Sequence, residues 1–259
     1  MDAHVSGTAR IACLNHKGGV GKTTCAVNLA AGLAGAGFRV LAVDVDPQAH
    51  LTASFGLHVP PGRDLAAVLG GALPAGEACI ALGKLSVLPA SSALAEAEMA
   101  LSRQDAPVTL LREQLEGCAG FDVVLYDCPP HLGPLTRQAL GAARGVFVPM
   151  TPDFLALQSL AWLMETLGAD NGGPGVRGIV LNRFSQRKRL HREVQSAVAG
   201  HFPGIPFATC IRENVALAEA PSHGQDIFRY APASAGAKDF AALCREAAKR
   251  LDLAGRARS

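Results

Sequence analysis

The sequence lacks the features of a membrane-spanning or secreted protein. No apolar run reaches the roughly 18–20 residues that a transmembrane helix needs. The first ten residues, MDAHVSGTAR, have neither the charged nor the apolar region of a secretory signal. The seven cysteines form no CxxC pair, and their odd number argues against a disulfide framework. We therefore expect a protein of the reducing cytoplasm.

Charge is scarce and unevenly spread. Charged residues make up 18% of the 259 residues and apolar residues 49%, which fits a well-packed globular protein rather than a disordered one. Residues 1–175 carry 10 Lys/Arg against 15 Asp/Glu, and residues 176–259 carry 14 against 7. A basic C-terminal third can attract nucleic acid or anionic lipid, and it can equally be an ordinary solvated face.

Short apolar runs alternate along the chain with longer Ala/Leu-rich stretches. Near-continuous apolar runs are typical of strands buried on both faces of a parallel sheet. The alternation therefore predicts a doubly wound, mostly parallel α/β sheet flanked by helices. The expected strands are Ile11–Asn15, Val40–Asp46, Leu85–Ala90, Asp122–Tyr126, Val146–Met150, Gly178–Asn182 and Phe207–Ile211. The expected helices are Thr23–Ala34, Leu94–Gln104, Val108–Gly117, Leu155–Leu167, Arg192–His201 and Ala235–Leu251.

This pattern predicts a single domain over residues 1–259. We expect a flexible leader at residues 1–9 and a flexible tail at 253–259. The first motif begins at His16, which leaves no room before it for a helix-turn-helix domain. Any contact with DNA is therefore expected to come from the main body of the protein.

Between the first expected strand and the first expected helix runs HKGGVGKTT, residues 16–24. The ordinary phosphate-binding loop, G-x-x-x-x-G-K-[ST], has glycine where this chain has His16, and the rest fits in register. Lys22 would neutralise the β- and γ-phosphates of ATP, and the Thr23 hydroxyl would ligate Mg²⁺. The positive end of the following helix faces the same place. The residues whose flexible backbone lets N–H groups converge on phosphate are Gly18, Gly19 and Gly21.

The run K-G-G-V-G-K-T-T at 17–24 resembles the ParA/Soj branch of the deviant Walker A P-loop NTPases. In that family the early lysine, here Lys17, reaches across a dimer interface to the nucleotide of the other subunit. The resemblance implies an ATP-state homodimer in which Lys17 couples nucleotide to association, because ADP lacks the γ-phosphate that this lysine contacts. The nucleotide-binding residues of the loop are then Lys17, Gly18, Gly19, Val20, Gly21, Lys22, Thr23 and Thr24.

Two expected strands end in acids, at the edge where open α/β sheets bind ligands. In residues 123–130, V-V-L-Y-D-C-P-P, Asp127 follows an apolar run, as a Walker B aspartate does. We expect it to lie near Mg²⁺ and to contact the ion through a water molecule. A helix N-cap or turn aspartate is the alternative. V-D-V-D-P-Q, residues 43–48, matches the family's second acidic motif. The resemblance implies that Asp46 positions or activates the attacking water and that Asp44 supports the switch loop. By the same resemblance, the expected catalytic residues are Lys17, Lys22 and Asp46.

The resemblance continues in the C-terminal third. In G-I-V-L-N-R-F, residues 178–184, the strand ends at Asn182, whose amide is suited to the edge of adenine and could equally be a turn residue. E-N-V-A-L-A-E-A-P-S-H-G at 213–224 is similar to the family's N-V-R-L-S-E-A-P-S-H-G. Two basic positions of the family are missing, since Ala216 and Glu213 stand where relatives have arginine. The basic candidates for DNA binding lie just before, at Arg183, Arg187, Lys188, Arg189 and Arg192.

Together these motifs predict a Mg²⁺-dependent ATPase of the ParA/Soj type. The resemblance implies that its ATP-state dimer binds nucleoid DNA non-specifically and that a ParB-like activator stimulates hydrolysis, in chromosome or plasmid partitioning. The losses at 213 and 216 leave open an orphan ParA-like ATPase that positions another cargo, such as a chemotaxis cluster, secretion machinery or polysaccharide machinery. Stable membrane binding is disfavoured, because the expected helix Ala235–Leu251 lacks a bulky apolar face.

Overall fold

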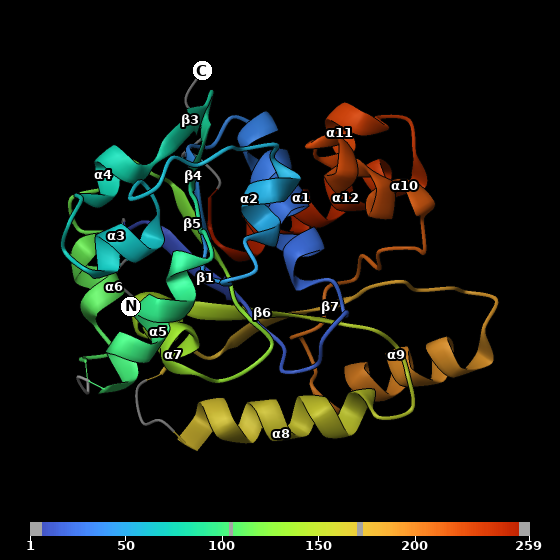
Figure 1. The fold of residues 1–259 in the computed structure, drawn as a ribbon. Helices are drawn as coiled ribbons and strands as arrows, with labels where there is room; N and C mark the ends of the chain where they lie inside the picture. The colour runs from blue at the N-terminus through green and yellow to red at the C-terminus, as the bar shows by residue number, and fades with distance from the viewer. Residues whose placement is uncertain (1–6, 104–105, 170–172, 254–259) are drawn as a thin grey trace.

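Seven strands form one sheet in the order β3-β4-β2-β5-β1-β6-β7 in the computed structural model, which describes residues 7–103, 106–169 and 173–253 (Figure 1). Every neighbouring pair is parallel except β3 with β4. The expected doubly wound, mostly parallel sheet is confirmed. The strands are β1 (Ala9–Cys13), β2 (Val40–Asp44), β3 (Ile80–Leu82), β4 (Leu85–Leu88), β5 (Val123–Asp127), β6 (Gly145–Met150) and β7 (Val176–Leu181).

Helices cover both faces of the sheet (Figure 1). Alternate residues of β1 point to opposite sides: Ile11 and Cys13 join one hydrophobic cluster, and Ala12 joins the other. The first cluster includes α1 (Lys22–Gly35) and α12 (Ala235–Arg250). The remaining helices are α2 (His50–Ser54), α3 (Leu65–Leu69), α4 (Ala75–Ala78), α5 (Ala93–Arg103), α6 (Leu110–Gln114), α7 (Pro134–Ala142), α8 (Ala156–Ala169), α9 (Arg189–His201), α10 (Val215–Glu219), the 3₁₀ turn η1 (Ala220–His223) and α11 (Ile227–Tyr230).

The expected strand Phe207–Ile211 is wrong. This segment runs beside β7 but forms no continuous ladder in the structure: isolated bridges flank it, Ile179 with Pro206 and Phe184 with Arg212. Between them, the N–H of Ile211 donates to the carbonyl of Leu181 at 2.8 Å. Pro206 has no N–H to donate to a ladder. The N–H of Phe207 donates to the carbonyl of Ile179 in β7 at 2.9 Å, but the N–H groups of Ala208 and Thr209 donate to the Glu246 carboxylate at 2.7 and 3.1 Å. The apolar run thus packs against the sheet without extending it.

Short elements were also missed. β3 has three residues and pairs antiparallel with β4 through a turn at Gly83, whose φ is 72°. A strand of this length leaves almost no alternating pattern in a sequence. α9 begins at Arg189 rather than Arg192, so both arginines lie on the helix.

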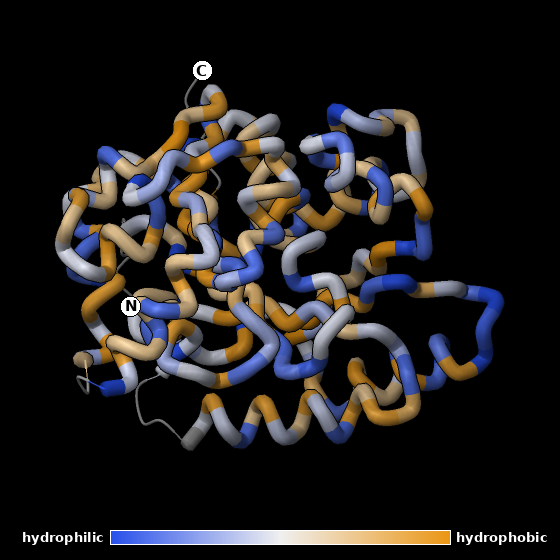
Figure 2. Tube along the Cα trace, in the orientation of Figure 1, coloured by the Kyte–Doolittle hydropathy of each residue, from blue (hydrophilic) through white to orange (hydrophobic). Residues whose placement is uncertain are grey.

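The ends of the chain fall mostly outside the description. Residues 1–6 and 254–259, which make up most of the expected flexible leader and tail, are not among the described residues. β1 already begins at Ala9, and Leu253 is fully buried. Within the described ranges, no helix has the length and apolarity to cross a bilayer. Figure 2 shows a hydrophilic stretch where the chain passes from β7 to α9, which is the basic segment 183–192.

Candidate nucleotide-binding site

The glycine-rich loop joins the end of β1 to the start of α1. Gly19 and Gly21 have φ of 74° and 96°, a left-handed conformation that glycine adopts without strain. Gly21 immediately precedes α1, and a Cβ atom there would lie 2.1 Å from Nδ2 of Asn182. Both the backbone and its neighbour therefore require glycine at position 21.

Asn182 fastens the end of β7 to this loop. Its Nδ2 donates to the carbonyl of Val20 at 2.8 Å, and its Oδ1 accepts the N–H of Arg183 at 3.0 Å. Only 4% of the residue is exposed. The amide thus supports the loop from inside the protein, and its role toward adenine stays a prediction.

Lys22 lies at the base of the loop. The residue is 8% exposed, and its Nζ donates to the carbonyl of Lys17 at 3.2 Å. Burial lowers the pKa of Lys22, while the nearby carboxylates of Asp127 and Asp46 act in the opposite direction. The first turn of α1 therefore presents a cation beside two acids at the carboxyl edge of the sheet.

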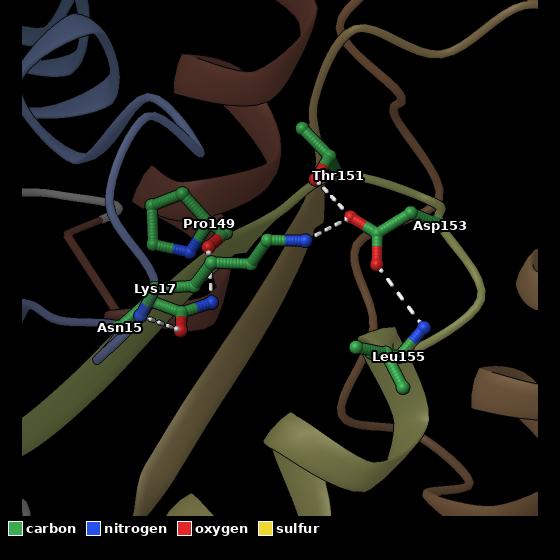
Figure 3. A network of polar contacts seen from close by, with 6 residues as sticks. All are labelled: Asn15, Lys17, Pro149, Thr151, Asp153 and Leu155. Atoms are coloured by element: carbon green, nitrogen blue, oxygen red, sulfur yellow. Dashed lines mark hydrogen bonds and ion pairs between the residues drawn. The ribbon is translucent and has the colours of Figure 1, made fainter.

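Lys17 is engaged elsewhere, with an acid of its own chain (Figure 3). Its Nζ lies 2.5 Å from Oδ2 of Asp153, in the loop between β6 and α8. Thr151 donates to the same oxygen at 2.7 Å, and the N–H of Leu155 donates to Oδ1 at 3.2 Å. Asn15 fixes the backbone, because its Oδ1 accepts the N–H of Lys17 and its Nδ2 donates to the carbonyl of Pro149.

Asp127 and Asp44 are both fully buried at neighbouring strand ends. Asp44 accepts hydrogen bonds from the N–H and hydroxyl of Thr52 at 2.8 and 2.7 Å, yet burial still raises its pKa to about 6. Among the residues that the structure describes, none donates a hydrogen bond to either carboxylate oxygen of Asp127. Burial raises the pKa of Asp127 well above its usual range, and Asp44 adds to the shift. The neighbouring Thr23 hydroxyl and Lys22 act the other way.

A cavity of about 540 Å³ borders the phosphate loop. Asp46 lies on its wall, and its Oδ1 accepts the N–H of Gln48 at 2.9 Å. The structure thus gathers most of the predicted site residues at one place. Its lining is Gly18, Gly19, Gly21, Lys22, Thr23, Thr24, Asp46, Pro47, Gln48, His50, Pro130, His131 and Arg183.

Four of the predicted nucleotide- and metal-site residues do not line the cavity: Lys17, Val20, Asn182 and the fully buried Asp127. Sequence reasoning missed several neighbours that do, among them His131, whose Nε2 lies 3.2 Å from Oε1 of Glu98 on α5. No local signal marks such a pair, which is 33 residues apart. His16, which replaces the usual glycine, packs edge-on against Trp162 of α8, with ring centroids 4.7 Å apart.

The basic segment lies mainly outside this cavity. Lys188 pairs with Glu213 at 3.7 Å, and Arg189 pairs with Glu193 at 2.7 Å. Arg192 donates to the carbonyl of Gln186. Arg183 differs from these residues, because it lines the cavity itself.

The sequence and the fold have clear relatives. A family model described as "AAA domain" matches residues 8–169. The chromosome-partitioning ATPase Soj of Thermus thermophilus is 43% identical over 246 residues, covering 93% of this chain and 96% of that protein. The chromosome partitioning protein ParA of Caulobacter vibrioides is 37% identical over 250 residues, covering 93% and 94%.

Two solved structures are similar to this fold over most of their length. A cobyrinic acid a,c-diamide synthase from Mycobacterium smegmatis, with bound ATP analog and magnesium, has a TM-score of 0.79 at 31% identity, covering 92% of this chain and 93% of that one. The septum site-determining protein MinD of Pyrococcus horikoshii, complexed with Mg-ADP, has a TM-score of 0.80 at 26% identity, covering 98% and 100%.

The fold and the glycine loop define a P-loop NTPase with a mostly parallel sheet. The relatives specify it further: the chain belongs to the ParA/Soj family of chromosome-partitioning ATPases, as its motifs predicted.

Proposed function

We propose that this chain is a Mg²⁺-dependent ATPase whose ATP-state homodimer binds DNA non-specifically and acts in chromosome or plasmid partitioning. The observation that carries the proposal is the convergence of the glycine loop, Lys22, Asp46 and the unpartnered Asp127 at one edge of the sheet. The names of the relatives and the nucleotides bound in similar structures support it. A ParB-like protein is the proposed activator, and the cytoplasm, at the nucleoid, is the proposed location.

Thr23, which lines the cavity, and the neighbouring buried Asp127 suit a hydrated cation. Mg²⁺ keeps several waters and takes one or two protein ligands beside phosphate oxygens. A buried carboxylate without hydrogen-bond donors next to a threonine hydroxyl fits that preference, so Thr23 and, through water, Asp127 would hold the ion. When bound, the ion would neutralise charge on the phosphates. Lys22 and the loop N–H groups bind the phosphates directly.

Asp46 is the proposed residue for the attacking water. It lies in the loop that follows β2. Its Oδ1 accepts the N–H of Gln48, and this hydrogen bond restrains the side chain. The other oxygen, Oδ2, accepts a hydrogen bond from the water and orients it toward the γ-phosphate. Removing this carboxylate should stop hydrolysis while leaving nucleotide binding intact.

Lys17 supplies the switch in this proposal. In the single chain its ammonium pairs with Asp153, away from the cavity of its own subunit. A partner subunit carrying a γ-phosphate would offer a second anion, so ATP and not ADP favours release of Lys17 and closure of the dimer.

The proposed DNA surface consists of Arg187, Lys188, Arg189 and Arg192. Summed positive charge, rather than any single contact, decides non-specific binding to phosphates. One observation favours the second candidate, an ATPase that positions a non-DNA cargo. Glu213 pairs with Lys188 and so removes one cation from this surface besides adding a negative charge.

The test compares Asp46→Ala and Lys17→Ala with the parent protein. We expect Asp46→Ala to hydrolyse ATP at less than about a tenth of the parent rate, since one lost water-positioning group costs at least 1.4 kcal/mol. It should remain a dimer in ATP by light scattering, whereas Lys17→Ala should remain a monomer. Hydrolysis by Asp46→Ala at the parent rate would refute the assigned role.

A further inference from the structure

Arg183 has an unusual backbone conformation for a residue with a side chain. Its φ is 51°, in the left-handed region, two residues after β7 ends at Leu181. A non-glycine residue in this region is strained, and such strain persists where the surroundings fix it, often at binding sites. Here the fixing contact is the hydrogen bond from the Arg183 N–H to Oδ1 of Asn182.

That contact places Arg183 next to the phosphate loop. The Nδ2 of Asn182 donates a hydrogen bond to the carbonyl of Val20 and packs against Gly21. The turn at Arg183 therefore ends β7 beside the loop, and Arg183 lines the same cavity as Lys22. The other basic residues of the segment lie elsewhere: Arg187 borders a separate hollow with Phe184 and Arg212, and Arg189 and Arg192 border another on α9.

Arg183 also differs from its neighbours in its ion pairs. Lys188 and Arg189 each have a glutamate partner, whereas within the described part of the chain no acidic side chain forms an ion pair with Arg183. Apart from the histidines, whose charge depends on pH, the cationic side chains lining the cavity are Lys22 and Arg183. A guanidinium presents five donors in a plane that matches phosphate oxygens.

We propose that Arg183 is a nucleotide ligand, binding the phosphates of a nucleoside di- or triphosphate in its own subunit, and not a DNA contact. The inference rests on the proposed nucleotide site. Arg183 is connected to the loop through Asn182, whose Nδ2 donates to the carbonyl of Val20 and lies against Gly21, on the β7 side of the cavity. It therefore binds the phosphates that ADP and ATP share, and it strengthens the binding of both by a similar factor.

The test measures binding of Mg-ADP and of a non-hydrolysable Mg-ATP analogue by calorimetry, without DNA. Arg183→Gln should weaken both nucleotides by about 10- to 100-fold, the range expected for a lost charge-assisted hydrogen bond. Arg183→Lys keeps the charge without the planar donors, so its nucleotide affinity should lie between those of the parent and of Arg183→Gln. Hydrolysis at saturating ATP should keep its rate while KM rises, because the contact is made before and during the reaction.

Arg177, on the opposite end of β7 and outside the cavity, gives the matched control. Arg177→Gln should bind both nucleotides like the parent. Arg183→Gly provides a check on folding: it removes the side chain together with the strain, so it should melt no lower than the parent and still lose affinity.

Parent-like nucleotide binding by Arg183→Gln, with loss of DNA binding in the Asp46→Ala background, would overturn the proposal and return Arg183 to the DNA surface. A failure of the proposed nucleotide function would look different, because the parent protein itself would then bind neither nucleotide.

Discussion

The ammonium of Lys17 and the carboxylate of Asp153 lie 2.5 Å apart across 136 residues of sequence (Figure 3). Asp153 also accepts hydrogen bonds from the Thr151 hydroxyl and from the N–H of Leu155. One acid therefore joins the start of the phosphate loop to the start of α8. A lysine that serves a partner subunit must first leave this acid. In the proposed switch, the strength of this pair would therefore set how readily the ATP-state dimer forms.

Asp153→Asn should make ATP-dependent dimerisation easier. The substitution removes the charge that holds Lys17, so the dimer should appear at a lower protein concentration, by roughly two- to fivefold for a pair that is more than a third exposed. Sedimentation in ATP and in ADP measures this. A Thr151→Val variant, which removes one hydrogen bond but no charge, should shift the midpoint less, and an Asp153→Asn dimer that forms only at higher concentration would contradict the account.

The same variant has a pH signature. Partial burial raises the pKa of Asp153, but Lys17, Thr151 and the N–H of Leu155 together outweigh it and lower the pKa. A carboxyl with a lowered pKa stabilises the fold above its unfolded pKa of about 3.9 and loses that contribution as pH falls below it. Parent and Asp153→Asn should therefore differ slightly in melting temperature near pH 7 and converge below about pH 4.

Asp127→Asn should separate stability from activity. The parent buries a carboxylate without a hydrogen-bond donor, and the neutral amide should raise the free energy of unfolding by about 1 kcal/mol, or roughly 2–4 °C in melting temperature. Folding raises the pKa of Asp127, so the parent loses stability as pH rises, and the advantage of the variant should grow above about pH 4.

Hydrolysis by Asp127→Asn should fall by at least about 100-fold, because the substitution removes the carboxylate proposed to hold the hydrated Mg²⁺. Chelation of Mg²⁺ should reduce the parent to a similar rate. Unchanged hydrolysis with full stability would show that Asp127 is only a turn residue.

The phosphate loop was predictable because its chemistry is local. Gly19, Gly21, Lys22 and Thr23 act within one turn of chain, so their spacing alone specifies both the backbone and the ligand. The position of Asp46 and Asp127 at one edge followed from the parallel sheet, which brings successive strand ends together, whereas the role of Asp46 came from the family resemblance.

Contacts between distant segments left no such pattern. In the sequence, nothing distinguishes Asp153 from other loop acids, and only the fold brings it to Lys17. Likewise, His131 and Glu98 are 33 residues apart in the sequence and come together only in the folded protein. Arg183 was grouped with the basic run by composition, whereas its φ and its place in the cavity depend on Asn182 and the loop. The wrong strand at 207–211 has the same origin: apolarity was read correctly, but Pro206 and Glu246 decide the pairing.

Glu213→Gln should strengthen DNA binding without stabilising the protein. The pair with Lys188 is exposed, 57% and 68%, so its removal should change the melting temperature very little. It frees one cation and removes one negative charge, so the slope of log affinity against log salt should steepen by about one unit. Glu116→Gln, which removes an exposed acid distant in sequence from the basic segment, is the control for net charge. An equal effect of both variants would contradict a specific role of Glu213.

The most direct measurement is DNA binding by the Asp46→Ala variant, in ATP and then in ADP, across a salt series. We expect binding in ATP only, without sequence preference, falling by about 40-fold between about 50 and 200 mM salt for about three phosphate contacts, since Glu213 occupies Lys188. A stable ATP dimer that ignores DNA at every salt concentration would contradict partitioning on DNA, and would assign the same switch to a different cargo.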